Sequence, residues 1–302
     1  MTGPPRMWSI VVPTYDRETA LTACLDALAA TALPAGAAEV IVVDDGSPRP
    51  VADVVAAFAP RLPLRTCRQR NAGPAAARNA GARDARGDRL VFLDDDCLVD
   101  RTWWTRLVAH CRRHPAAMIG GGTQNGLADD PYAACHHLLY DYLSRRSNGR
   151  PHAATFCTSN NLAVPTAGFV ELGGFDETFP FAAGEDRDFC DRWRASGRAI
   201  VHAPDVVVHH AHPMTLRSFW RQHFRYGRGA RRLHERRFAR GAGGIALQRP
   251  SFYLGLLAFP FREVAPSSLP ACMSLLLVSQ VATAGGYVVE RFVGSRPAHA
   301  AR

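Results

Sequence analysis

The stretch Leu90-Val-Phe-Leu-Asp-Asp-Asp-Cys-Leu-Val-Asp100 places three adjacent carboxylates directly after a short apolar run. The run Leu90 to Leu93 is too short for a helix and predicts a buried strand. Asp94, Asp95 and Asp96 then lie at the carboxyl end of this strand, which is the ligand-binding edge of an open α/β sheet. Like charges this close repel one another unless a cation lies among them or they face water. We therefore expect either a site for a divalent ion with oxygen ligands or a solvated acidic turn.

Strand and helix patterns alternate before this stretch. Trp8 to Pro13, Val40 to Val43 and Leu64 to Gln69 are rich in β-branched and apolar residues and predict strands. A helical pattern follows each of them, which indicates an α/β fold with a mainly parallel, Rossmann-like sheet and flanking helices. Because the carboxyl ends of parallel strands meet at one edge, Tyr15, Asp45 and the three aspartates should line a common crevice.

The composition narrows the range of possible functions. Hydrophobic residues make up 47% and charged residues 21% of the 302 residues, which is typical of a globular protein. All 36 basic residues are Arg, and the absence of Lys excludes a Lys-dependent phosphate loop or Schiff-base mechanism. No Gly-x-Gly-x-x-Gly motif follows the first strand, which disfavours a dinucleotide-dependent dehydrogenase. The eight Cys include no Cys-x-x-Cys pair, so we expect buried thiols in a reducing compartment.

Two further groups of titratable residues lie in the second half of the chain. Glu185 and Asp186 precede a helical pattern and should lie at its amino end, where the helix dipole stabilises carboxylates. That position is by itself a sufficient structural reason for them. A strand-like run ends at His209 and His210, with His212 close behind, and these residues could supply a metal ligand or be ordinary loop histidines.

Six motifs along residues 8–230 resemble, in their order and spacing, those of family 2 glycosyltransferases of the GT-A fold. They are Val12-Pro-Thr-Tyr-Asp-Arg17, Val43-Asp-Asp-Gly-Ser47, Asn71-Ala-Gly with Arg78-Asn-Ala-Gly81, Phe92-Leu-Asp-Asp-Asp96, Gly173-Gly-Phe-Asp-Glu177 and Gly184-Glu-Asp-Arg-Asp188. The resemblance implies a nucleoside-diphosphate-sugar donor, a Mg²⁺ or Mn²⁺ ion and inversion at the anomeric carbon. Asp16 stands where many relatives have Asn, and Cys97 where many have another Asp.

The resemblance also implies which residues bind the donor. Pro13, Thr14 and Tyr15 match positions at the end of the first strand that flank the nucleotide base. Asp45 matches the carboxylate that reads the base, and Arg78 matches a basic position near the diphosphate.

The same resemblance implies a metal site at the acidic stretch. Asp94-x-Asp96 matches the DxD element, in which Asp95 would lie nearest the ribose or sugar and Asp96 would bind the metal directly, with Asp94 beside it. One of His209 and His210 matches a histidine that reaches the metal in relatives, and we favour His209 at the end of its strand.

The catalytic residues implied by the resemblance are Asp186 and Glu185. Asp186 would take the proton from an acceptor hydroxyl as it attacks, and Glu185 would hold the acceptor or orient the base. The metal and Arg78 would offset the charge that develops on the leaving diphosphate. This mechanism is a direct displacement without a covalent intermediate.

The excess of positive charge gathers in one segment. From Arg217 to Arg240 the chain has nine Arg and one Glu, which accounts for +8 of the formal net charge of +9. Phe219, Trp220 and Phe224 recur at helical spacing beside these arginines, which predicts an amphipathic basic helix. No aromatic-rich sheet or zinc module accompanies the cluster, so we expect no nucleic-acid partner.

A long apolar segment follows the basic helix. Val264 to Val289 runs 26 residues without a charge, long enough to span a bilayer, although Pro266 and Pro270 interrupt it. We expect a membrane span, a hairpin that lies on the membrane, or an apolar helix pair that covers the catalytic domain or a dimer interface. The arginines just upstream agree with a cytosolic face against anionic lipid.

These features predict a GT-A catalytic domain at residues 1–215 and a basic amphipathic helix with an apolar helical tail at residues 216–302. Met1 to Arg6 lacks the apolar segment of a signal peptide, so we expect the catalytic domain on the cytoplasmic face of the cell membrane. The expected partners are a nucleotide-sugar donor, a cell-envelope saccharide or lipid-linked acceptor, and the membrane surface.

Two other functions remain open. A nucleotidyltransferase of related fold is disfavoured because the first strand lacks a Gly-rich phosphate loop with a basic residue. A non-catalytic membrane-associated scaffold that binds nucleotide sugars is disfavoured because Asp94, Asp96 and Asp186 are all present.

Overall fold

The computed structural model describes residues 7–31, 33–34, 36–149, 154–179, 181–241 and 249–293. Met1 to Arg6, where the sequence predicts no signal peptide, lies outside these ranges, as does the end of the predicted C-terminal segment from residue 294.

One mixed sheet of eight strands, in the order β3-β2-β1-β4-β7-β6-β8-β5, forms the centre of the described chain. The strands are β1 (Trp8–Thr14), β2 (Ala38–Asp44), β3 (Leu64–Arg68), β4 (Arg89–Leu93), β5 (Cys97–Val99), β6 (Met118–Asn125), β7 (Asn161–Pro165) and β8 (Ile200–His210). The first four strands along the chain pair in parallel, as the alternating pattern predicts. The second half differs, because β7 is antiparallel to β4 and β6, and β5 is antiparallel to β8.

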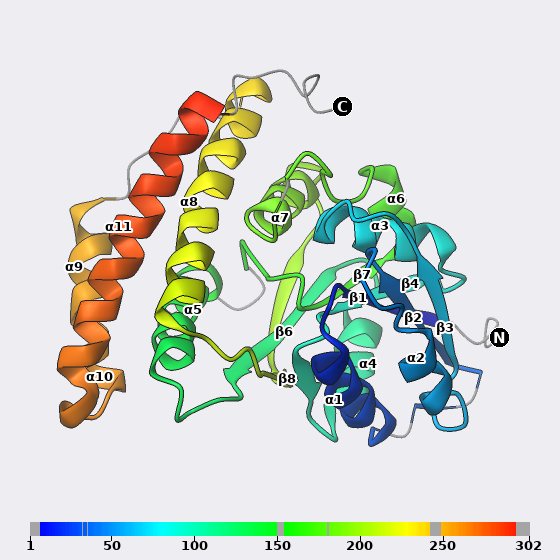
Figure 1. Ribbon diagram of the computed structural model, residues 1–302. Coiled ribbons are helices and arrows are strands. Elements are labelled where there is room, and N and C mark those ends of the chain that lie inside the picture. Colours follow the sequence, from blue (N-terminus) through cyan, green and yellow to red (C-terminus); the bar gives the residue numbers. More distant parts are fainter. Residues whose placement is uncertain are drawn as a thin grey trace.

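Helices cover both faces of the sheet (Figure 1). One face carries α1 (Glu18–Ala29), α2 (Ala52–Phe58) and α4 (Trp103–Arg113). The other face carries α3 (Pro74–Asp84), α6 (Thr166–Glu171) and α7 (Glu185–Ala195). Because each layer buries its own apolar cluster against the sheet, β1 and β2 are buried along their whole length.

The structure also contains elements that the sequence did not predict, namely β5, α6 and α5 (Pro131–Asn148). α5 has clear start signals, since Pro131 follows Asp130, whose side chain accepts hydrogen bonds from the backbone N–H groups of Tyr132 and Ala133. The strand-like run that the sequence predicts up to His210 is the end of the longer strand β8.

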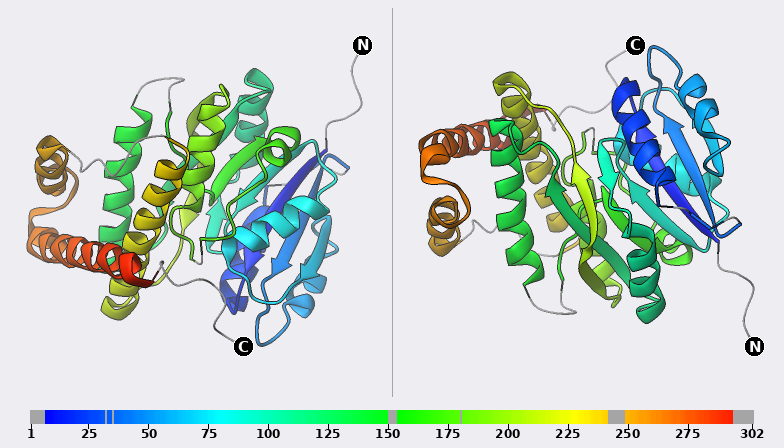
Figure 2. Two further views of the ribbon diagram at one scale, coloured as in Figure 1. Left: turned by 90° about the horizontal axis from the view of Figure 1, so that it is seen from above. Right: turned by 90° about the horizontal axis from the view of Figure 1, so that it is seen from below.

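A helical layer lies beside the sheet (Figures 1 and 2). It consists of α5 with α8 (Leu216–Ala239), α9 (Pro250–Ala258), α10 (Pro260–Glu263), a 3₁₀ turn (Pro266–Ser268) and α11 (Leu269–Val293). α5, α8, α9 and α11 share a separate small apolar core. The predicted basic helix is α8, and α5 from the first half of the chain packs with the C-terminal helices.

Glycines allow α8 and α11 to approach closely. A Cβ atom added at Gly286 of α11 would lie 1.9 Å from the carbonyl oxygen of Phe224 in α8. A Cβ atom added at Gly227 of α8 would lie 1.9 Å from the carbonyl oxygen of Thr283 in α11. Any larger residue at either position would therefore push the two backbones apart.

A buried ion pair joins the same two helices. Glu290 of α11 is buried and accepts hydrogen bonds from Arg228 Nε at 2.6 Å and from Arg232 Nη2 at 3.0 Å, both on α8. Among the described residues, Pro266–Val293 is the one helical segment long and apolar enough to cross a membrane, and 28% of its most apolar window is buried. The apolar segment is thus attached along its length to an arginine-rich helix.

Two alanine substitutions test this packing. We expect Gly286→Ala to lower the free energy of unfolding by about 1–3 kcal/mol, because overpacking a close contact costs that much. Gly285→Ala is the matched control, since its added Cβ meets only the Phe224 ring at 3.8 Å. Gly285→Ala should leave the free energy of unfolding unchanged or raise it by about 0.5–1 kcal/mol, because Ala favours the helical conformation more than Gly does. If urea unfolding shows the same change in free energy for Gly286→Ala and Gly285→Ala, the close approach of α8 and α11 at Gly286 is contradicted.

Candidate active site

The ends of β1 and β4 bring the first and fourth motifs together. Thr14 Oγ1 donates a hydrogen bond to Asp95 Oδ2 at 2.7 Å. The chain then turns at Asp16, whose φ of 53° is left-handed. Arg17 Nη1 donates to Asp95 Oδ1 at 2.9 Å and to Asp96 Oδ2 at 2.7 Å. Because β1 and β4 are parallel neighbours, residues that follow both strands meet at one edge, as predicted.

The two buried aspartates differ in their affinity for a proton. Burial raises the pKa of Asp95 to about 7, although the charge of Arg17 opposes the rise. Burial also disfavours the ionised form of Asp96, but the charge and hydrogen bond of His210 outweigh it and hold the pKa of Asp96 well below its usual range. Asp96 is therefore the ionised carboxylate of the pair near neutral pH.

His210 and His212 lie beside Asp96, whereas His209 does not. His210 Nε2 is 3.3 Å from Asp96 Oδ1, and His212 Nδ1 is 3.1 Å from Asp96 Oδ2. His209 pairs with Leu98 one position along β8, so the pleat turns its side chain to the opposite face of the sheet. The strand register thus places His210 beside Asp96, and the metal-binding role preferred for His209 stays a prediction.

Arg78, which the resemblance places near the diphosphate, lies inside the protein. Its side chain is 2% exposed. Nη2 donates a hydrogen bond to Asp94 Oδ1 at 2.6 Å, and Nη1 donates to Glu185 Oε1 at 3.0 Å. Arg78 therefore joins the end of β4 to the start of α7, which the sequence did not predict, and its role near the diphosphate stays a prediction.

α7 begins with Glu185 and Asp186, as the sequence predicts. Burial raises the pKa of Glu185 to about 7, Asp186 adds to the rise, and Arg78 opposes it. Burial also raises the pKa of Asp186, which Arg187 and Arg78 oppose and the charge of Asp94 increases. The carboxylates of β4 and α7 thus share one electrostatic environment with Arg78 between them.

The residues expected at the nucleotide base differ in exposure. Tyr15 follows β1 and is 47% exposed, so its ring is available for stacking, whereas Pro13 is buried within β1. Asp45 is 4% exposed. Its carboxylate accepts a hydrogen bond from Gln69 Nε2 at 2.7 Å and from two backbone N–H groups of the loop before α3, both at 2.9 Å. Asp45 therefore holds this loop in place.

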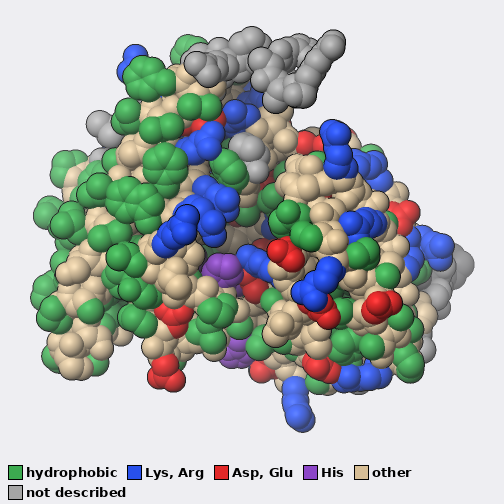
Figure 3. Space-filling view, viewed as in Figure 1, with side chains coloured by type: hydrophobic (Ala, Val, Ile, Leu, Met, Phe, Trp, Pro, Cys, Tyr) green, Lys and Arg blue, Asp and Glu red, His purple; other side chains and the backbone are tan. Residues whose placement is uncertain are grey.

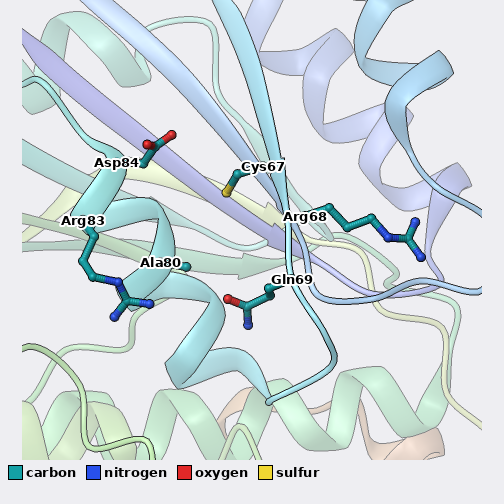
Figure 4. Close-up of a pocket in the computed structure, with 6 residues that line it drawn as sticks. All are labelled: Cys67, Arg68, Gln69, Ala80, Arg83 and Asp84. Atoms are coloured by element: carbon teal, nitrogen blue, oxygen red, sulfur yellow. The ribbon is translucent and has the colours of Figure 1, made fainter.

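An open pocket lies next to the same loop, between the end of β3 and α3 (Figure 4). Its lining residues are Cys67, Arg68, Gln69, Ala80, Arg83 and Asp84. The pocket adjoins Asp45 through Gln69 and does not include the acids of β4 or α7.

The acidic edge has suitable donor atoms for a divalent ion. The described residues contain no group of three His, Cys, Asp or Glu side chains that could hold a metal. Asp96 with His210 or His212 nevertheless offers a carboxylate oxygen and an imidazole nitrogen, which suit Mn²⁺. A metal here would have two protein ligands and would complete its shell with substrate oxygens or water. Arg17 neutralises the same carboxylate and would compete with that ion.

Glu185 predicts a pH dependence of stability. Its pKa is raised from 4.5 to about 7, so the folded state binds this proton more tightly than the unfolded chain. The stabilisation that comes from this bound proton is fully present below about pH 4.5 and is lost as the pH rises toward about 7. As the pH rises between these values, we expect the Tm of Glu185→Gln to fall less than the Tm of the wild type, because Gln has no proton to lose. Glu235→Gln, on the exposed part of α8, should follow the wild type, and identical profiles for all three proteins would contradict the raised pKa.

Comparisons with known proteins agree with these motifs. A family model of glycosyl transferase family 2 matches residues 9–169, and one of glycosyl transferase family group 2 matches residues 90–288. The validoxylamine A glucosyltransferase of Streptomyces hygroscopicus subsp. limoneus is 30% identical over 244 residues, which cover 69% of this chain and 54% of that protein. The pre-mycofactocin glycosyltransferase of Mycobacterium tuberculosis (strain ATCC 25618 / H37Rv) is 31% identical over 197 residues, which cover 63% of this chain and 41% of that protein. The chain thus spans about half the length of the curated relatives it matches.

Solved structures resemble this one in fold. The mannosyltransferase PcManGT from Pyrobaculum calidifontis, in complex with GDP-Man and Mn²⁺, has a TM-score of 0.63 at 20% identity and covers 97% of this chain and 80% of its own. S. aureus TarS 1–349 in complex with UDP-GlcNAc has a TM-score of 0.52 at 19% identity, and the match covers 95% of this chain and 91% of the TarS chain. These similarities show the predicted GT-A fold. Since the first family model spans more than half of the residues, the chain belongs to glycosyl transferase family 2.

Proposed function

We propose that this chain is the catalytic part of an inverting glycosyltransferase. It moves a sugar from a nucleoside-diphosphate-sugar to an acceptor hydroxyl, with Mg²⁺ or Mn²⁺ and an aspartate base. The observation that carries this proposal is the bridge from Arg78 to Asp94 and Glu185, which gathers the acids of β4 and the start of α7 in one place. Family membership supports the chemistry, and the ligands of PcManGT and TarS support the donor class and the metal.

The donor is proposed to bind along the edge formed by β1 and β4. The exposed ring of Tyr15 would stack on the base, Pro13 and Thr14 would shape the strand end, and Asp45 would hold the adjacent loop. Aromatic stacking accepts any base, and PcManGT and TarS were solved with a guanine and a uracil nucleotide respectively. The identity of the base therefore has to be measured with a panel of donors.

The diphosphate is proposed to lie over the end of β4. A metal held by Asp96 and by His210 or His212 would offset the negative charge on the leaving group. Arg17, with a side chain that is 40% exposed, is an accessible cation at this position. We propose that it turns from Asp96 to the diphosphate when the metal binds Asp96, and that it has the role that the resemblance suggested for Arg78. Its planar guanidinium group can bind a phosphate through two hydrogen bonds.

Asp186 is proposed to accept the proton of the acceptor hydroxyl. Its Oδ1 accepts a hydrogen bond from the backbone N–H of Arg187 at 2.7 Å, and no hydrogen bond to Oδ2 is found in the described part of the chain. Burial raises its pKa, which makes the ionised form a stronger base. The acceptor oxygen then attacks the anomeric carbon from the face opposite the diphosphate, so the configuration inverts in one step.

We also propose that α9 to α11 lie on the cytoplasmic surface of a membrane and do not cross it. The exposed apolar side chains of this layer include Leu254, Leu257, Phe261, Leu277, Val281 and Phe292. Figure 3 shows hydrophobic side chains over the outer surface of the helical layer. A membrane-spanning α11 would carry the arginines of α8 into hydrocarbon, which is costly, because the two helices are packed together. At the surface, the same arginines would face anionic headgroups.

Replacement of the base tests this function. With Mn²⁺ present, we expect the wild type to hydrolyse one member of a panel of UDP-, GDP- and dTDP-sugars. Asp186→Asn should lower that rate by about 10²- to 10⁴-fold, the usual contribution of a general base. Thermal shifts should show that the variant still binds the donor, because Asp186 does not contact the nucleotide.

Asp191→Asn is the matched control, since Asp191 lies on the same helix and pairs with Arg237, away from the acids of β4. The control should retain the wild-type rate. Turnover by Asp186→Asn at the wild-type rate would exclude Asp186 as the base, and the absence of any donor-dependent thermal shift would exclude the donor class.

A further inference from the structure

Three arginines on α8 have no carboxylate partner. The other arginines of the helix pair with acids: Arg228 and Arg232 with Glu290, Arg231 with Glu235, Arg236 with Asp176, Arg237 with Asp191 and Arg240 with Asp188. Among the described residues, no Asp or Glu oxygen lies within 4.0 Å of a guanidinium nitrogen of Arg217, Arg221 or Arg225. The first half of α8 thus carries uncompensated positive charge.

Two guanidinium groups converge on one aromatic ring. The guanidinium carbons of Arg225 and Arg228 both lie 4.8 Å from the centre of the Phe181 ring. Burial lowers the pKa of Arg225, and the like charges of Arg221 and Arg228 lower it further. Arg221, Arg225 and Arg228 therefore form a basic cluster in which the protein holds like charges together, and Glu290 is the one carboxylate paired with it in the described part of the chain.

The basic cluster lies beside the candidate active site. Phe181 belongs to the loop that leads into α7, and α8 packs directly on this loop, because a Cβ atom added at Gly229 would lie 2.0 Å from the carbonyl oxygen of Ala183. Tyr226 lies between Arg225 and Arg228 along the helix. Burial raises the pKa of its hydroxyl to about 12, and the charge of Asp186 adds to that rise. The cluster is thus next to the proposed base, on the side of the helical layer.

The exposed apolar helices α9 to α11 lie beside α8, which carries the basic cluster. In Figure 3 basic side chains gather along α8, between the apolar surface of the helical layer and the recess that contains histidine. A ligand that reaches from the membrane to the acids would therefore pass the basic cluster.

We propose that Arg221, Arg225 and Arg228 bind a phosphate group of a lipid-linked acceptor. Guanidinium groups bind phosphate through paired hydrogen bonds, and a phosphate would supply the negative charge that Arg221 and Arg225 lack, since Arg228 already pairs with Glu290. The lipid chain would lie on the apolar face of α9 to α11 while the acceptor hydroxyl reaches Asp186. This inference rests on the proposed transferase function and specifies its acceptor.

Vesicle binding by the full chain tests the subsite. The probe is farnesyl phosphate in phosphatidylcholine vesicles, and an equal amount of phosphatidylglycerol in the same vesicles represents ordinary anionic headgroups. We expect Arg225→Gln to weaken binding to the farnesyl phosphate vesicles about tenfold, the value of one charged hydrogen bond. Arg217→Gln, which removes an unpaired arginine elsewhere on α8, should leave it unchanged. Arg221→Gln, at an exposed position, is the second variant if Arg225→Gln does not fold.

Equal losses in the Arg217 and Arg225 variants would overturn the subsite, because they would indicate general electrostatic attraction. Equal binding to phosphatidylglycerol vesicles would also overturn it in favour of a membrane-surface contact. The assay needs no donor and no turnover. Donor hydrolysis without farnesyl phosphate binding would therefore contradict the subsite alone, and binding without donor hydrolysis would contradict the proposed transferase function.

Discussion

The buried guanidinium group of Arg78 is the contact on which the arrangement of the site depends. It joins Asp94 at the end of β4 to Glu185 at the start of α7, across a separation of 107 residues between Arg78 and Glu185. Removing a charge from water costs several kcal/mol, which only close and well-oriented partners offset. Arg78 and Glu185 can therefore be buried only because they pair with each other and with the half-buried Asp94. The Ala-rich α3 makes this possible, since its small side chains let the helix pack closely on the sheet.

Much of the fold follows from local patterns in the sequence. The apolar runs of β1, β2 and β4 correctly predicted parallel strands whose carboxyl ends share one edge. The contacts of Thr14 and Arg17 with the aspartates at that edge were not predicted. Side-chain direction was not predictable in the same way. Whether Arg78 faces the acids or a diphosphate depends on the rotation of α3, and whether His209 or His210 meets Asp96 depends on the register of β5 against β8. α5 was missed because it contacts β6, α8 and α11 and has no single apolar stripe.

The helical layer connects the site to the proposed membrane surface through short contacts. α8 approaches the loop before α7 at Gly229 and approaches α11 at Gly227, so one helix backbone touches both this loop and the apolar segment. Because these contacts are between backbones, little can shift in one without moving the other. This packing places the arginines in the first half of α8 between the apolar helices and the loop that leads into α7.

The most direct test of this account is the free energy of unfolding of Arg78→Met, alone and combined with Glu185→Gln. Arg78→Met leaves two carboxylates without their cation, and we predict that it lowers the free energy of unfolding by about 3–5 kcal/mol. Adding Glu185→Gln should restore part of this loss, because it removes one of the two carboxylates. Arg83→Met on the exposed face of α3 should cost less than about 1 kcal/mol. A loss for Arg78→Met as small as that for Arg83→Met, or no recovery in the double variant, would contradict the central role of Arg78.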